Sequence, residues 1–175
     1  MERELGAVVS EEQITFAGVI PFAMNAEGTL SLLLGVENYG RERGKWSGFA
    51  GRVEDVDGGN PLVTAAREGY EESAGLLGTP SDLKNFLERK GVEHRTARGV
   101  HYLLPFQYNS YLPVMFQGVQ AAIKSGDRPC PRMLEKAAIA WCSEDVLTTL
   151  PLRFGFSKDL ESVLCSARKS TSAKK

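Results

Sequence analysis

The sequence predicts an α/β fold in which helices cover a mixed β-sheet. Apolar runs of strand length are interleaved with two or three amphipathic helical segments, and they lack the regular strand-helix repeat of an all-parallel sheet. The chain has 175 residues, enough for one domain with a large core that needs neither disulfides nor structural metals. We therefore expect a single domain over residues 1–167 and a disordered basic tail over residues 168–175.

Composition narrows the functional class. The formal net charge is -1, whereas a general nucleic-acid binder carries a basic excess over much of its surface. No general nucleic-acid binding is therefore expected. The N-terminus lacks the basic start and apolar run of a signal peptide, and no apolar stretch is long enough to span a bilayer. The three cysteines have no metal-ligand spacing, so free thiols in a cytoplasmic protein are expected.

The first third of the chain predicts strands. An apolar, partly β-branched run at 14–23 is followed by a turn at 25–28 and a second apolar run at 30–36, which indicates a hairpin buried on at least one face. A further strand is predicted over 46–53. It contains Gly51, where the absence of a side chain would let the backbone approach a ligand closely.

The loop before that strand, residues 38–45, is rich in glycine and basic residues. Arg43 and Lys45 stand next to Trp46. Cations beside an aromatic side chain could bind a phosphate group or stack on a base. Such a loop is more often simply solvated, and the sequence leaves both interpretations open.

Asn60 and Pro61 predict the start of a helix, because asparagine is a favoured N-cap and proline a favoured first helical residue. Gly75 is well placed to end it. Gly69 lies mid-helix at a cost of roughly 1 kcal/mol relative to alanine, and its missing side chain could let another element pack close. The expected buried side consists of Leu62, Ala65, Ala66 and Tyr70.

Three glutamates of this helix, Glu68, Glu71 and Glu72, fall at i, i+3 and i+4. Their carboxylates stand on one face and repel one another unless a cation lies between them. Hard cations such as Mg²⁺ take oxygen ligands, often one or two carboxylates with waters and substrate phosphates. The pattern favours a divalent-metal site beside Arg67, which can fix a glutamate by a bidentate bond. The alternative is an acidic face that is merely solvated.

Less can be predicted for the second half of the chain. His94 and His101 are the only histidines, and both are expected to be surface or strand residues because neither has a recognisable catalytic partner. The loop at 125–132 holds two prolines and is expected to be flexible or lid-like. The predicted elements are a helix at 81–90 capped by Ser81, a strand at 99–107, a helix or strand at 114–124, a strand at 135–141 and a helix at 157–167.

Part of this pattern resembles the Nudix box, the loop-helix signature of enzymes that hydrolyse nucleoside diphosphates linked to another group. The residues that carry the resemblance are Gly51, Arg67, Glu68, Glu71, Glu72 and Gly75. Four further stretches look like landmarks of the same family in the same order, namely 16–21, 32–35, 46–51 and 135–141.

The resemblance implies an α/β/α sandwich with a mixed β-sheet and a hydrolase that uses Mg²⁺ or Mn²⁺. The metal would neutralise phosphate oxygens, lower the pKa of a bound water and stabilise the leaving group. The implied metal ligands are the backbone carbonyl of Gly51 and the carboxylates of Glu68, Glu71 and Glu72.

Catalytic roles are implied for Arg67, Glu71 and Glu135. Arg67 would hold the glutamates in register, and Glu71 supplies a carboxylate that could take a proton. Glu135 is implied as a base or an additional ligand. The alternative for Glu135 is an exposed edge residue beside Lys136.

The expected partner is a nucleotide-like diphosphate substrate, with capped RNA among the candidates. No association with a membrane is expected. Residues expected to contact this substrate are Arg43, Lys45, Trp46 and Arg153, although Arg153 could instead anchor the last helix. A homodimer is compatible with the resemblance.

The sequence departs from the family pattern in the loop before the helix and at the helix end. The upstream glutamate of the pattern is replaced by Gly59, the interval from Gly51 to Arg67 is two residues longer, and Ala74 is one extra residue before Gly75. These changes favour an alternative function, a catalytically weak or inactive nucleotide-binding module. If Asp57 replaces the missing glutamate as the partner of Arg67, the loop would still be tethered.

Overall fold

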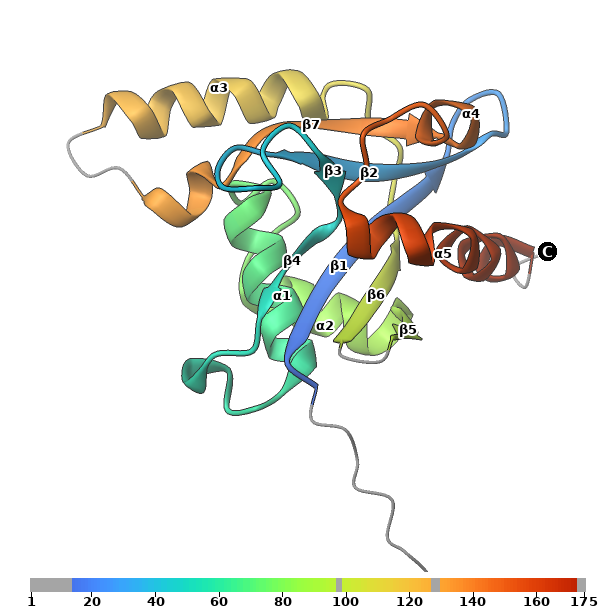
Figure 1. Ribbon diagram of the computed structural model, residues 1–175, viewed down its shortest axis with the longest axis horizontal. Coiled ribbons are helices and arrows are strands. Elements are labelled where there is room, and N and C mark those ends of the chain that lie inside the picture. The colour runs from blue at the N-terminus through green and yellow to red at the C-terminus, as the bar shows by residue number, and fades with distance from the viewer. Residues whose placement is uncertain (1–13, 97–98, 127–129, 173–175) are drawn as a thin grey trace, which may run out of the picture.

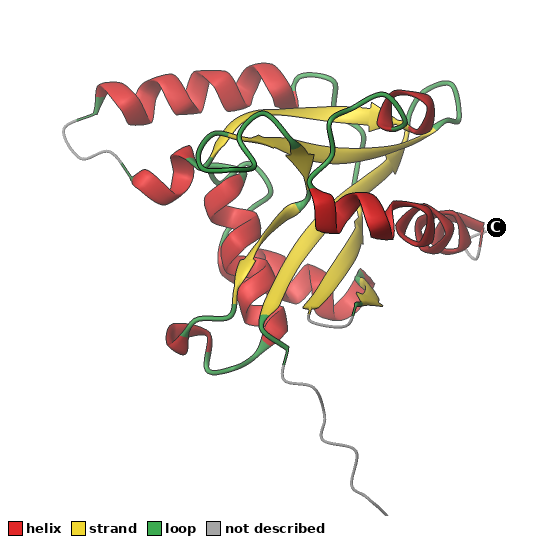
Figure 2. Ribbon diagram, viewed as in Figure 1, coloured by secondary structure: helices red, strands yellow, loops and turns green. Residues whose placement is uncertain are grey.

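The computed structural model describes residues 14–96, 99–126 and 130–172. A seven-stranded mixed sheet forms its centre, and helices lie on both faces of the sheet (Figures 1 and 2). The strands are β1 (Phe16–Met24), β2 (Leu30–Glu37), β3 (Trp46–Ser47), β4 (Phe49–Arg52), β5 (Val92–Arg95), β6 (Gly99–Pro105) and β7 (Lys136–Ser143). The mixed α/β sandwich expected from the sequence is confirmed.

Five α-helices and two short 3-10 helices connect and cover the strands in the described residues. The α-helices are α1 (Pro61–Glu72), α2 (Pro80–Lys90), α3 (Leu112–Ser125), α4 (Glu144–Leu147) and α5 (Phe154–Ser172). The 3-10 helices are η1 (Asp55–Asp57) and η2 (Pro131–Leu134).

Strand β1 is the centre of the sheet. It pairs in antiparallel fashion with β2 and β4 and in parallel with β6. Strand β7 pairs antiparallel with β2, and β5 with β6. The sheet therefore contains one parallel pair among antiparallel ones, as a mixed sheet requires.

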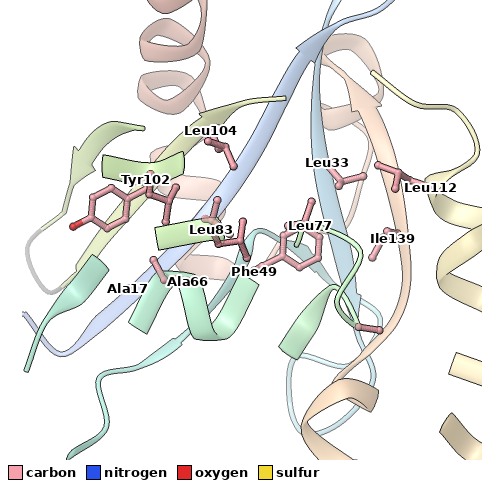
Figure 3. Close-up of a cluster of buried hydrophobic side chains, with 14 of the residues drawn as sticks. Ala17, Leu33, Phe49, Ala66, Leu77, Leu83, Tyr102, Leu104, Leu112 and Ile139 are labelled. Carbon is pink, nitrogen blue, oxygen red and sulfur yellow. The ribbon is translucent and has the colours of Figure 1, made fainter. Parts of the chain in front are cut away.

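The two faces of the sheet carry separate hydrophobic clusters. Val19 and Leu33 belong to the cluster under α1, α2 and α3, part of which is drawn in Figure 3. Their neighbours Ile20 and Leu32 belong to the cluster on the opposite face, under α4 and α5. Successive strand residues point to opposite faces, so both faces of β1 and β2 are apolar.

The hairpin predicted near the N-terminus is confirmed, with Phe22 opposite Leu32 in the β1–β2 register. The single strand expected over 46–53 is wrong. Trp46 and Ser47 pair with β2, whereas Phe49–Arg52 pair with β1, so the chain changes strand partner at Gly48. A side chain at Gly48 would meet Ile20 at 2.7 Å, which explains why the change of partner occurs at a glycine.

The ends of several elements differ from the predictions. Helix α2 is capped by Thr79, whose side chain accepts a hydrogen bond from the Asp82 amide, and not by Ser81. The segment for which helix and strand were both open is helix α3. Helix α5 extends through Ser172, so the predicted disordered tail is wrong for residues 168–172, and residues 173–175 lie outside the described residues.

Cys130, Cys142 and Cys165 are all free thiols, as expected. Among the described residues, none of the helices is both long and apolar enough for a membrane span.

Candidate active site

Helix α1 begins where its sequence predicts. The Asn60 side chain accepts a hydrogen bond from the Leu62 amide, and Pro61 is the first helical residue. Gly69 lies where a Cβ atom would meet Val19 of β1 at 2.7 Å and Leu83 of α2 at 3.2 Å. The glycine therefore lets the helix pack directly onto the centre of the sheet, and this packing fixes the position of its acidic face.

The turn after α1 accommodates Ala74, the extra residue before Gly75. Helical structure stops at Glu72, and both Ala74 and Gly75 have positive φ values, 52° and 80°. The Gly75 amide reaches back to the Tyr70 carbonyl at 2.8 Å. The additional residue is therefore taken up in the turn, and the spacing of the three glutamates stays helical.

Asp57 is the partner of Arg67. The arginine Nε and Nη2 atoms donate to the two oxygens of Asp57, each at 2.9 Å. Thr64 donates to Asp57 as well, at 2.8 Å. Asp57 is buried, and the hydrogen bonds from Arg67 lower its pKa to about 2. The expected substitute for the missing glutamate is confirmed as an Arg67 contact.

The remaining donors of Arg67 hold the glutamates. Its Nη1 atom donates to Glu68 Oε1 at 2.7 Å and to Glu71 Oε2 at 3.1 Å. Its Nη2 atom also donates to the Arg52 carbonyl in β4, at 3.1 Å. One guanidinium therefore connects the loop, the strand end and the acidic face.

Glu68 lies against Gly51. A Cβ atom at Gly51 would stand 2.2 Å from Glu68 Oε1, so only glycine leaves room for this carboxylate. Glu68 is only 6% exposed, and burial raises its pKa to about 7 despite the opposing effect of Arg67. The close approach that the sequence predicts at Gly51 is made by the protein's own glutamate.

Glu72 is directed inward. It is 3% exposed, its Oε2 atom accepts a hydrogen bond from the Ala50 amide at 2.7 Å, and Lys136 Nζ lies 3.4 Å from the same oxygen. Burial raises the pKa of Glu72 to about 8, against the opposing charge of Lys136. Of the three helix glutamates, it has the most enclosed carboxylate.

Lys136 and Glu37 also belong to this region, which the sequence did not predict. Lys136 is completely buried, and its Nζ donates to Glu37 Oε1 at 2.6 Å and Ser47 Oγ at 3.1 Å. A lysine at the start of a strand is normally exposed, so its sequence position gave no sign of burial. The only available hint was Gly35, which leaves space for the lysine stem.

Glu135 immediately precedes β7 and does not belong to the strand. The pKa of Glu135 is raised by burial and by the charge of Glu71, and its own charge helps to raise the pKa of Glu68. The charges of Lys136 and Glu37 also act on the Glu135 carboxylate. Arg132 of η2 lies on the acidic face, 3.4 Å from Glu71 and 3.2 Å from Glu54.

The donors fit a hard divalent cation by their chemistry. Glu68 supplies carboxylate oxygens beside the Gly51 backbone, and Glu71 shares the Arg67 guanidinium with it; carboxylate oxygens suit Mg²⁺ or Mn²⁺. Within the described part of the chain, no three acidic, histidine or cysteine side chains converge as a metal cage. The helix carboxylates instead face Arg67, Arg132 and Lys136, so a bound ion would compete with these cations.

The four residues expected to bind substrate lie in two groups. Trp46 and Arg153 are held together by the backbone, because the Arg153 amide donates to the Trp46 carbonyl at 2.9 Å. The Arg153 guanidinium also lies 3.4 Å from Glu37. Arg43 and Lys45 are on the preceding loop, where Arg43 is exposed and Lys45 pairs with Glu42 at 3.0 Å.

A pocket of about 270 Å³ opens beside β4, on the face of the sheet covered by α5. Arg153 lines it, together with Ala50, the residue before Gly51. His101 also lines it, and its buried Nδ1 has no hydrogen-bond partner among the described residues. Burial lowers the pKa of His101 to about 4, so the ring is neutral at pH 7. This strand histidine presents a polar group that a ligand could use.

The structure is similar to those of known Nudix proteins. RenU, a Nudix hydrolase from M. smegmatis, matches with a TM-score of 0.54 and 17% identity over 92% of this chain and 87% of that chain. The Nudix domain of Shewanella oneidensis NrtR, solved with ADP ribose, matches with 0.53 and 16% over 90% and 87%. A Nudix hydrolase from Alicyclobacillus acidocaldarius matches with 0.53 and 15% over 89% and 93%.

At these identities the comparison establishes the fold, which is the Nudix fold. Searches with protein-family models and among curated protein sequences found no match.

Proposed function

We propose that this chain, which has the Nudix fold, is a divalent-metal-dependent hydrolase that cleaves a diphosphate linkage in a nucleoside diphosphate joined to another group. One observation carries the proposal. Arg67 is held by Asp57 and in turn holds Glu68 and Glu71, so the acidic face of α1 is fixed beside the Gly51 backbone. A solvated acidic helix has no need of such a support.

Glu68, Glu71, Glu72 and the Gly51 carbonyl are the proposed ligand set, with Glu135 as a base or further ligand. When bound, Mg²⁺ or Mn²⁺ would neutralise phosphate oxygens and activate water. The chain's own contribution is orientation: Arg67 keeps the glutamates in register, and Glu135 lies close enough to influence Glu68 electrostatically. Arg132 would leave Glu71 as the ion binds.

The pocket beside β4 is the proposed place for the nucleoside part of the substrate. Ala50, which lines the pocket, donates its amide hydrogen to Glu72 of α1 on the other face of the sheet, and Arg153 offers a cation for a phosphate oxygen. ADP-ribose is a reasonable first substrate to test because the similar NrtR domain was solved with that compound. Arg43 and Lys45 would contact the more distant end of the substrate.

The inactive binding module is less well supported. Its main argument was the loss of the loop glutamate at Gly59, which would leave Arg67 untethered. Asp57 now supplies that tether through two hydrogen bonds. This contact removes the main argument for an inactive module.

The proposal can be tested with a panel of ADP-ribose, dinucleoside polyphosphates, nucleoside diphosphate sugars and capped RNA, in Mg²⁺ and in Mn²⁺. Release of mononucleotide or phosphate is the readout. Hydrolysis of one member that depends on the metal supports the proposal, and failure of every member with either metal contradicts it.

Glu72→Gln is the variant with the sharpest expectation. Turnover should fall by at least roughly 100-fold, because a charge of the acidic face is lost. The melting temperature of the metal-free protein should stay level or rise, because the buried carboxylate is replaced by a neutral group of the same size. Glu88→Gln, on the exposed side of α2, is the matched control and should leave turnover unchanged.

A further inference from the structure

A pocket of about 900 Å³, here named the α2 pocket, opens on the side of the sheet that carries α1, α2 and α3. Two of the residues that line it, Leu77 and Leu104, are buried in the hydrophobic cluster of that face and are labelled in Figure 3. The pocket beside β4 lies on the opposite face and shares no lining residue with it. The α2 pocket is therefore a separate site, and its volume lies within the range of ligand sites, roughly 300 to 1,000 Å³.

Aromatic side chains gather at the α2 pocket. Phe86 of α2 and two tyrosines of the loop between β6 and α3, Tyr108 and Tyr111, all line it. All three are exposed, Tyr111 by as much as 72%. A hollow that exposes apolar rings marks a place where a ligand or partner binds, and rings pack favourably against other flat rings. The ligand should therefore contain a flat aromatic ring system.

The loop that carries the two tyrosines is fixed by contacts within the chain. The Tyr108 ring packs against Trp141 of β7, with the ring centres 5.3 Å apart. The Trp141 indole Nε1 donates to the Asn109 carbonyl at 2.9 Å, and the Asn109 side chain accepts a hydrogen bond from the Tyr111 amide at 2.9 Å. A ligand therefore meets a wall that is already ordered, which lowers the entropic cost of binding.

Lys90 determines which charge the pocket prefers. It is the only charged residue among those that line the pocket, and it forms no ion pair or side-chain hydrogen bond within the described residues. Phe86 and Lys90 are four residues apart on α2, so the ring and the cation are neighbours on one helix face. A flat ring that packs on Phe86 therefore brings an attached anionic group to Lys90.

A single cation in a largely apolar pocket suits a single negative charge. One charge-assisted hydrogen bond satisfies a carboxylate at this position. A phosphate monoester carries about -1.5 to -2 charges at pH 7, and part of that charge would lie uncompensated against the apolar lining. The polar side chains at the rim, Gln107 and Ser110, are uncharged. The lining therefore favours a carboxylate over a phosphate.

We propose that the α2 pocket binds a small aromatic carboxylate, with its rings against Phe86 and Tyr108 and its carboxylate paired with Lys90. The site adjoins the turn after α1, because Leu77 lines the pocket and its amide donates to Ser73 Oγ at 3.2 Å. The assignment is independent of the proposed hydrolase activity, since it uses no residue of the acidic face.

The compound 2-naphthoate is a suitable probe, because it joins a flat fused ring system to one carboxylate. In calorimetric titration of the full chain it should bind with a dissociation constant below about 1 mM. The alcohol 2-naphthylmethanol has the same rings without the charge and should bind about 10-fold more weakly. Two-dimensional NMR should show shifted amide resonances at 76–78 and 104–111 and an unchanged resonance for His101 in the pocket beside β4.

Lys90→Gln should abolish the preference for the acid. It should weaken binding of 2-naphthoate by about 10-fold and leave binding of the alcohol unchanged. Lys124→Gln is the matched control, because Lys124 is also an exposed, unpaired lysine within the described residues, in the last turn of α3, and does not line the pocket. The control should leave both affinities unchanged.

Phe86→Ala should weaken both probes to a similar degree, because it removes ring contact and no charge. Phe154→Ala is its control, since Phe154 is another exposed phenylalanine beneath a cation, Lys158, as Phe86 lies beneath Arg89. Circular dichroism checks that each variant is folded, and the lysine pair decides the question if Phe86→Ala is not.

Failure of 2-naphthoate to bind overturns the assignment, as do equal affinities for the acid and the alcohol or NMR shifts confined to the pocket beside β4. AMP, which joins an aromatic base to a phosphate, should shift the resonances at 104–111 only at higher concentrations than the acid; the reverse order overturns the choice of carboxylate. A wild-type dimer in sedimentation that Phe86→Ala separates means that a second copy covers the pocket, and this too overturns the assignment.

Discussion

Asp57 shows how a single residue can compensate for a changed loop. The loop between β4 and α1 is longer than the family pattern and carries Gly59 where a glutamate would stand. Helix η1 places the Asp57 carboxylate on Arg67 instead, and the Glu54 amide donates to Asp57 at 2.9 Å. The guanidinium thus has the same kind of partner, supplied from a different position.

Asp57→Asn should lower turnover by roughly 10- to 100-fold, because the loss is in the orientation of Arg67 rather than in a metal ligand. The free energy of unfolding should fall by about 3 kcal/mol, since one half of a buried ion pair is removed. Steady-state kinetics at a temperature where the variant is folded, together with urea unfolding, checks both effects.

Gly59→Glu is the companion variant and should change turnover little, because Arg67 already has its partner. A silent Asp57→Asn together with a strong gain from Gly59→Glu would mean that the native tether has no functional role.

The sequence alone predicts that residues lie together where their spacing along a helix brings them to one face. Glu68, Glu71 and Arg67 could be placed together because helical spacing brings them to one face. Lys136 could not be placed, because its burial depends on a one-residue bulge and on a partner, Glu37, that is distant in the chain. The pairing register of two strands that are distant in the chain cannot be read from the local periodicity of either strand.

At the scale of elements, cap residues predicted one helix start correctly and missed another, since Thr79 and not Ser81 caps α2. Asn60 and Pro61 gave the start of α1 correctly, since cap chemistry is local. The apolar run at 46–53 gave one strand where the chain forms two, because the exchange of partners at Gly48 depends on Ile20 of β1. Strand β5 was not predicted, because its alternation of half-buried and exposed side chains spans only four residues.

Two glycine-to-alanine changes separate helix propensity from packing. Gly69→Ala should destabilise the protein by roughly 1 to 3 kcal/mol, because the new methyl group would collide with Val19 of β1. Gly118→Ala in α3 meets no atom within 4 Å, so it should stabilise by about 0.5 to 1 kcal/mol through helix propensity.

Denaturant unfolding of both variants under one condition is the measurement. If Gly69→Ala is as stabilising as Gly118→Ala, the close contact between α1 and the sheet is not a constraint on the fold.

At the scale of the whole molecule, the acidic face makes stability depend on pH. Burial raises the pKa of Glu68 to about 7 and that of Glu72 to about 8, both above their ordinary value of 4.5. The folded state therefore keeps protons that the unfolded chain has released. Their stabilising effect is complete below pH 4.5 and is lost as the pH rises through 7 and 8.

The metal-free protein should accordingly lose a few kcal/mol of stability between pH 5 and pH 8.5, since one pKa unit corresponds to about 1.4 kcal/mol. Urea unfolding across this range, with Glu68→Gln and Glu72→Gln giving flatter profiles, checks the expectation. Saturating Mn²⁺ should reduce the loss, because the ion binds the ionised carboxylates. Stability that rises with pH over this interval would contradict the assignment.

The parallel pairing of β1 with β6 also determines when the molecule can take shape. Phe16 lies opposite Gly99 and Phe22 opposite Pro105, so a nascent chain cannot close its central pair until Pro105 has emerged from the ribosome. High contact order of this kind is associated with slower folding. Helix α1 packs on β1 and β4, which precede it in the chain. Glu135 of the proposed ligand set follows β6, however, so a divalent ion finds no complete site on the early chain and should act by slowing the unfolding of the finished protein.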